Sequence, residues 1–162
     1  QFMANTGNGQ FREVDPSTLG HYFEGRYLGR ALARLDWNGD GRQDAVVSHL
    51  DAPVALLTNT VQEHGGFLTL HLRGVQSNRD AIGSIVEIQL QDRTITRQLM
   101  AGDGFHASNE RVLIFGLGAD EVVENMTVRW PSGRREEFTQ VPANTRWIAI
   151  EGAGQLFHVH LQ

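Results

Sequence analysis

The residues best suited to metal chemistry lie in one short stretch, Asp36-Trp37-Asn38-Gly39-Asp40-Gly41-Arg42-Gln43-Asp44. Oxygen-bearing side chains occupy its first, third, fifth and ninth positions, and glycine occupies the sixth. Calcium is a hard cation that takes roughly six to eight oxygen ligands, and alternate residues of a tight loop can turn inward to supply them. We therefore predict a calcium site whose ligands are Asp36, Asn38, Asp40, Asp44 and the backbone carbonyl of Arg42.

This loop differs from the calcium loop of an EF-hand. That motif needs a glutamate at its last ligand position, where this chain has Val47. The flanking residues Arg34-Leu35 and Ala45-Val46-Val47 are typical of strands rather than helices. Oxygen ligands supplied by a single loop suit an ion that holds the two strands of a hairpin together, so we expect the calcium to be structural. A turn rich in Asn, Asp and Gly without a metal is the alternative.

The elements that must position this loop are strands. Runs of four to eight residues, separated by glycine, asparagine and aspartate clusters, indicate an all-β chain. In 122–130 we expect Val122, Met126, Val128 and Trp130 on one apolar face. One apolar and one polar face per strand indicates antiparallel sheets around one core, as in a small β-sandwich. The expected strands of this part are 67–73, 84–91, 94–100, 122–130, 134–141, 146–150 and 155–161.

The N-terminal part carries an internal repeat. Phe2-Met3-Ala4-Asn5-Thr6 matches Leu56-Leu57-Thr58-Asn59-Thr60 at an offset of 54 residues. A β-rich repeat near this length is typical of propeller blades, which need neighbours to bury their faces. We therefore predict a partial propeller-type blade at 1–62 and a β-sandwich at 66–162, joined by a linker at 62–66.

The composition excludes several classes of protein. The chain has 162 residues, with 14 lysines and arginines against 19 aspartates and glutamates, for a formal net charge of −5. This acidic balance argues against a nucleic-acid partner, because phosphate binding needs a basic surface. The absence of cysteine excludes disulfides, thiolate metal sites and a cysteine nucleophile. No apolar run approaches the roughly 20 residues of a membrane helix, so we expect no membrane insertion.

Several motifs carry a family resemblance. The metal loop with the Ala45-Val46-Val47 that follows it resembles the calcium loop of FG-GAP/VCBS repeats, the blades of integrin-α-type β-propellers. The run Asn5-Thr6-Gly7-Asn8-Gly9-Gln10-Phe11 resembles the segment between such blades. Four later motifs resemble the ASPIC/UnbV domain and occur in the expected order. The combination is similar to the C-terminal region of the cartilage acidic protein 1 (CRTAC) family. The four motifs are Ser77-Asn78-Arg79-Asp80-Ala81-Ile82-Gly83, Gly102-Asp103-Gly104-Phe105, Phe115-Gly116-Leu117-Gly118 and Trp130-Pro131-Ser132-Gly133.

The resemblance implies a function. It implies calcium on the loop ligands, a secreted, periplasmic or cell-surface protein, and recognition of a protein or glycan rather than catalysis. The lack of cysteine excludes the EGF-like module of animal members and indicates a bacterial-type member. With only one repeat and part of another, we expect a C-terminal fragment whose exposed blade edges support self-association.

Two other functions remain open. One is an enzyme or an accessory subunit of a biosynthetic complex, although the sequence has no Gly-x-Ser-x-Gly motif and no recognisable group of acid and base residues. We therefore expect the protein not to be an enzyme. The other is a carbohydrate-binding module, for which Trp37, Trp130 and Trp147 are candidate stacking residues. The glycine-rich stretch 102–110 is either a binding loop or a turn that the sandwich requires.

Overall fold

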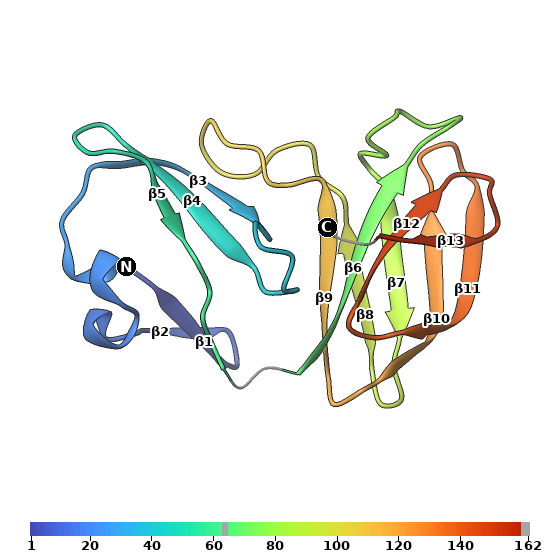
Figure 1. Ribbon diagram of the computed structural model, residues 1–162, viewed down its shortest axis with the longest axis horizontal. Coiled ribbons are helices and arrows are strands. Elements are labelled where there is room, and N and C mark those ends of the chain that lie inside the picture. The colour runs from blue at the N-terminus through green and yellow to red at the C-terminus, as the bar shows by residue number, and fades with distance from the viewer. Residues whose placement is uncertain (63–64, 160–162) are drawn as a thin grey trace.

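The computed structural model describes residues 1–62 and 65–159 and consists mainly of β-strands and their connections. Figure 1 shows an N-terminal part, with the strands between residues 3 and 57, and a C-terminal part, with the strands between residues 66 and 158. In the described residues, no helix is long and apolar enough to cross a membrane.

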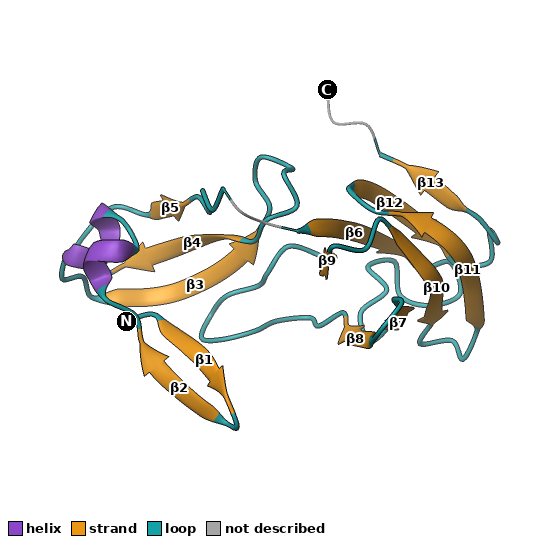
Figure 2. Cartoon of the chain, turned by 90° about the horizontal axis from the view of Figure 1, so that it is seen from below, coloured by secondary structure: helices purple, strands orange, loops and turns teal. Residues whose placement is uncertain are grey.

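The N-terminal part contains two small sheets. β1 and β2 form an antiparallel hairpin, and β3, β4 and β5 form a three-stranded antiparallel sheet in that order. Two 3₁₀ turns separate these sheets along the chain and lie at one end of the three-stranded sheet (Figure 2). The elements are β1 (Met3–Gly7), β2 (Gln10–Glu13), η1 (Pro16–Thr18), η2 (His21–Glu24), β3 (Gly29–Leu35), β4 (Asp44–His49) and β5 (Ala55–Leu57).

The C-terminal part contains two four-stranded sheets, with strand orders β11-β10-β7-β8 and β13-β12-β6-β9. Among the described residues, the pair β12–β6 is parallel and every other strand pair in these sheets is antiparallel. The strands are β6 (Gly66–Arg73), β7 (Ile85–Gln89), β8 (Thr94–Gln98), β9 (Val112–Gly118), β10 (Val122–Arg129), β11 (Arg135–Pro142), β12 (Thr145–Ile150) and β13 (Leu156–His158).

Apolar residues from both of these sheets form one core. Leu68 and Leu70 come from one sheet, Val86 and Ile88 come from the other, and all four are fully buried. Their spacing by two residues reflects the alternation of side chains across a strand. The all-β fold class is therefore confirmed, with antiparallel sheets and, in the described residues, no closed propeller.

The strands differ from the sequence prediction in three places. β9 was not predicted as a strand, and the pairing of β12 with β6 is parallel rather than antiparallel. Val122 is exposed and Val123 is buried instead. Between Val123 and Met126 the alternation is interrupted, where Gln140 of the neighbouring strand has a left-handed φ of 55°.

Two predicted segments extend beyond the described residues. The predicted linker 62–66 includes residues 63 and 64, and the predicted strand 155–161 includes residues 160 and 161. β13, which falls in the second segment, ends at His158. The division of the chain at 62–66 stays a prediction.

One long connection brings the two parts together. The segment 99–111 between β8 and β9 extends toward β3 in both views of the chain (Figures 1 and 2). Its backbone and side chains bond to the end of β3, directly before the predicted metal loop.

Candidate metal centre

The predicted metal loop joins β3 to β4. Asp36 directly follows β3, and Asp44 is the first residue of β4. The antiparallel pairing of Leu35 with Asp44 brings the two ends of the loop together. Gly39 and Gly41 have left-handed φ angles of 75° and 81°, which glycine adopts without a steric penalty. Strands flank the loop as predicted, so it is not an EF-hand.

The first and last carboxylates organise the loop backbone. Asp36 is buried, and its Oδ1 and Oδ2 accept hydrogen bonds from the N–H groups of Asp40 and Gly41 at 3.0 and 2.9 Å. Asp44 is also buried and accepts from the N–H groups of Trp37 at 3.1 Å and Asn59 at 2.7 Å. Asp44 thus connects the loop to the segment that follows β5.

The middle of the loop is more open. Asp40 Oδ2 accepts hydrogen bonds from the Asn38 amide at 2.6 Å and from the Arg42 guanidinium at 2.5 Å. Burial raises the pKa of Asp40, but hydrogen bonds from the Arg42 N–H and from Asn38, together with the charge of Arg42, outweigh that effect. The pKa of Asp40 is therefore below its ordinary value. At neutral pH the carboxyl is ionised and able to bind a cation.

The residues of the loop fit calcium by their chemistry. The five predicted ligands supply only oxygen atoms, which a hard cation prefers. Within residues 1–62 and 65–159, no three His, Cys, Asp or Glu side chains converge as a metal-binding group. The contacts with Asn38 and with the Arg42 guanidinium occupy Asp40 Oδ2, and the Arg42 N–H occupies Oδ1. An ion bound through Oδ2 would compete with the Asn38 amide and the Arg42 guanidinium.

An arginine from the C-terminal part contacts the first carboxylate of the loop. Arg146 lies in β12, and its guanidinium is 2.6 Å from Asp36 Oδ2. The side chains of Arg146 and Asp36 are 9% and 0% exposed. Sequence reasoning missed this contact because the two residues are 110 positions apart. Such a buried pair is costly to break, since the remaining charge has no solvent around it.

The connection 99–111 extends the edge of β3. The Arg34 N–H donates to Asn109 Oδ1, and the Arg34 carbonyl accepts from the Glu110 N–H, both at 2.9 Å. The Asp36 N–H donates to Glu110 Oε2 at the same distance. The sequence predicts either a turn or a binding loop at 102–110. Its C-terminal end contacts the N-terminal part of the chain.

The comparisons with known proteins bear on the C-terminal part. A family model described as "ASPIC and UnbV" matches residues 74–156, just over half of the chain. The chain belongs to the ASPIC/UnbV family. A comparison with curated proteins found no match. The matched range contains Glu110 and Arg146, which contact Asp36 of the metal loop, and Asn109, which contacts Arg34 just before it. The metal loop itself lies outside the matched range.

The metal loop also lies against Phe67 of β6, seven positions before the ASPIC/UnbV match begins. A Cβ atom on Gly41 would lie 2.2 Å from Phe67 Cγ. Gly9 has a similar left-handed φ of 72°, but a Cβ there would meet no atom within 4 Å. The two glycines therefore separate the cost of the backbone conformation from the cost of a collision with Phe67.

We predict that Gly41→Ala is more destabilising than Gly9→Ala. Both changes place a side chain in the left-handed region, at a cost of about 1–2 kcal/mol. Overpacking against Phe67 adds about 1–3 kcal/mol for Gly41→Ala alone. Urea unfolding of both variants in EDTA measures the difference. Equal losses of stability would show that the loop does not pack on Phe67 in solution.

Proposed function

We propose that this chain is a non-enzymatic recognition or scaffold module with a structural calcium ion. The carrying observation is the place of Asp36, which is both the first predicted ligand and the partner of Arg146. An ion on Asp36, Asn38, Asp40, Asp44 and the Arg42 carbonyl would offset three carboxylates and fix the β3–β4 hairpin. The ion and the Arg146 guanidinium would share the Asp36 carboxylate, so the ion would lie directly beside the contact between the hairpin and the ASPIC/UnbV domain.

The family origin of the chain and its cellular location are also part of what we propose. We propose that residues 1–62 are a remnant of an FG-GAP/VCBS repeat and that the chain is a bacterial-type relative of the CRTAC family. The repeat of Phe2–Thr6 at 56–60 supports this, because the first copy includes most of β1 and the second copy includes the end of β5. A secreted, periplasmic or cell-surface setting suits the loop, since extracellular calcium modules work at roughly 10⁻⁴–10⁻³ M calcium.

The proposal is tested by removing calcium. At a calcium concentration of about 100 times Kd, the bound ion contributes about 2.7 kcal/mol. For a chain of this size, that corresponds to a fall in Tm of about 5–10 °C when EDTA is added. Differential scanning calorimetry in metal-free buffer, before and after calcium is restored, measures the change. An unchanged Tm would overturn the calcium assignment.

A matched pair of variants shows whether the loop binds the ion. Asp44→Asn removes the charge of a predicted ligand, whereas Asp80→Asn removes the same charge from an exposed residue outside the loop. We expect the calcium-dependent rise in Tm to be lost in Asp44→Asn and kept in Asp80→Asn. Loss of the response in both variants, or in neither, would contradict binding at the loop.

The tryptophans offer less support for a glycan-binding surface. Trp130 is 3% exposed and belongs to the core. Trp37 is exposed in the metal loop, where its Nε1–H donates to Thr58 Oγ1 at 3.0 Å. A stacking platform therefore cannot include Trp130. We favour a protein partner over a glycan.

A further inference from the structure

The outer edge of β3 is covered over only part of its length. Arg34 directs its N–H and C=O away from β4 and toward Asn109 and Glu110. Leu32 lies two residues earlier, so its N–H and C=O point to the same edge. Among the described residues, neither of these groups of Leu32 has a hydrogen-bond partner. Unpaired strand edges of this kind accept another strand.

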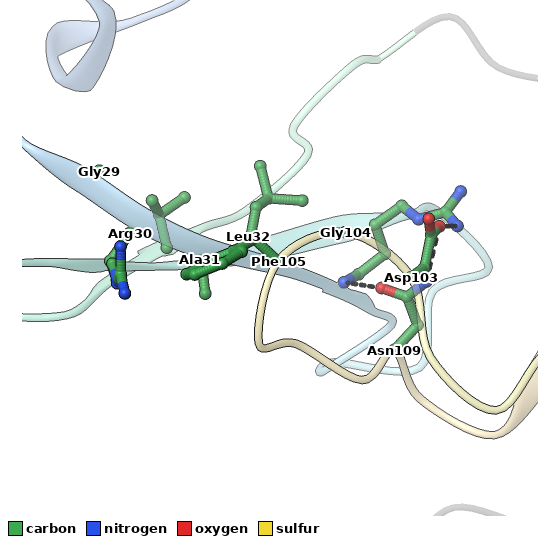
Figure 3. A pocket seen from close by; sticks show the side chains of 10 residues that line it. Gly29, Arg30, Ala31, Leu32, Asp103, Gly104, Phe105 and Asn109 are labelled. Carbon is green, nitrogen blue, oxygen red and sulfur yellow. Dashed lines mark hydrogen bonds and ion pairs between the residues drawn. The ribbon is translucent and has the colours of Figure 1, made fainter.

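A hollow of about 350 Å³ lies beside this edge. β3 lines one side, and the loop segment 103–105 lines another (Figure 3). Leu32 and Phe105 line the hollow while 50% and 53% exposed, and Val47 of β4 also lines it. The hollow thus combines free backbone groups with apolar walls, the two features that peptide recognition by strand addition uses.

The charges at the hollow favour an acidic partner. Arg34 pairs with Asp103 at 2.5 Å, so its charge is balanced. The guanidinium of Arg30 lies 4.3 Å from the centroid of the Phe105 ring, and no carboxylate of the described residues pairs with it. A carboxylate on a bound segment would meet an uncompensated positive charge there.

The covered end of the edge argues against a second copy of this chain. Two β3 strands that paired antiparallel about a two-fold axis at Leu32 would place Arg30 of one copy opposite Arg34 of the other. The backbone groups of Arg34 on that edge already bond to Asn109 and Glu110, so they are not free to pair with a second β3. The occupant is therefore a segment of another protein, with acidic residues beside its apolar ones.

We propose that the β3 edge binds an extended segment of a partner protein in which apolar and acidic residues alternate. The segment adds as a strand at Leu32, places apolar side chains against Leu32 and Phe105, and pairs a carboxylate with Arg30. This inference rests on the recognition role proposed above and names the chemistry of its partner.

The first test uses a fluorescein-labelled peptide of alternating valine and glutamate, as long as the seven residues of β3. Fluorescence anisotropy with the full chain in calcium is expected to show saturable binding with a Kd of about 100 μM. N-methylation of alternate peptide bonds removes backbone donors but keeps the side chains. We expect it to weaken binding at least about tenfold, as would lysine in place of glutamate.

Protein variants locate the site. We expect Arg30→Glu to weaken binding at least about tenfold and Phe105→Ala about fivefold. Phe11→Ala is the matched control, because Phe11 is exposed on β2 and does not line the hollow. It should leave the Kd unchanged. Amide exchange followed by NMR should show slower exchange of the Leu32 N–H in the complex.

Several results would overturn the inference. They are the absence of saturation up to about 1 mM peptide, equal binding of the N-methylated peptide, and equal effects of Phe105→Ala and Phe11→Ala. Protection of the Leu32 N–H by protein concentration alone would identify a second copy as the occupant. The calcium assay separates the two proposals. A calcium-dependent Tm without peptide binding overturns only this inference. Peptide binding without a calcium-dependent Tm overturns only the calcium site.

Discussion

Arg146→Met is expected to lower the free energy of unfolding by about 3–5 kcal/mol in EDTA. Methionine keeps much of the length of the side chain but leaves the buried Asp36 carboxylate without its cation. Denaturation in urea, compared with the wild-type chain, measures the loss. In EDTA the measurement reports on the ion pair without a competing metal.

The matched control is Arg34→Met. Arg34 also pairs with an aspartate, but the side chains of Arg34 and Asp103 are 43% and 55% exposed. Exposed pairs contribute about 0–1 kcal/mol, so this variant should be nearly as stable as the wild type. If the two variants lose the same stability, the buried pair does not anchor the loop. Asp36→Asn combined with Arg146→Met should recover part of the loss, because both charges are then absent.

Glu151→Gln is expected to lower the free energy of unfolding clearly at neutral pH. Glu151 is buried, and its Oε2 accepts hydrogen bonds from the N–H groups of Val75, Gln76 and Ser77 at 2.7–2.8 Å. Its Oε1 accepts from the hydroxyls of Ser77 and Ser132 at 2.9 and 2.5 Å. Burial raises the pKa of Glu151, but these hydrogen bonds outweigh it and lower the pKa from 4.5 to about 2.

The sign of the pH dependence follows from that shift. Because the folded state lowers the pKa of Glu151, its contribution is complete above about 4.5 and is lost as the pH falls toward about 2. The contribution at neutral pH is on the order of 2–3 kcal/mol. The gap in stability between the wild type and Glu151→Gln should therefore be constant near neutral pH and close between pH 4.5 and about 2.

Glu137→Gln provides the comparison for this measurement. Glu137 pairs with Arg135 at 2.7 Å, but both side chains are more than half exposed. Glu137→Gln should therefore change the free energy of unfolding by less than about 1 kcal/mol. A gap for Glu151→Gln that persists unchanged to pH 2 would show that the loss comes from side-chain shape rather than from charge.

The predicted metal ligands came from a local pattern. Asp36, Asn38, Asp40 and Asp44 lie within nine residues, and Gly41 fits the left-handed turn that the structure shows. The conformation of a short loop depends mainly on the residues within it, so their types and spacing can be interpreted from the sequence. The carboxylates of Asp36 and Asp44 do organise that loop, through hydrogen bonds to its own backbone.

The contacts across the chain had no comparable signal. Arg146 and Glu110 both contact Asp36, but they are distant from it in the sequence and only the folded chain brings them together. β9 was missed because Gly116 and Gly118 lie within it, and glycine is more typical of turns than of strands. Val122 was predicted on the wrong face because the alternation within β10 breaks between Val123 and Met126, and a strict period of two residues does not allow for such a break.

The parallel pairing of β12 with β6 has a consequence for the order of folding. β6 is made before β12 and lies between β9 and β12 in the sheet, and the pairing of Leu68 with Thr145 closes a loop of 77 residues. Such distant pairings form slowly, because the entropy of loop closure is lost before the contacts compensate for it. A growing chain therefore carries β6 with one uncovered edge until β12 has been synthesised. Truncation before β12 removes both that pairing and the Arg146 guanidinium that pairs with Asp36.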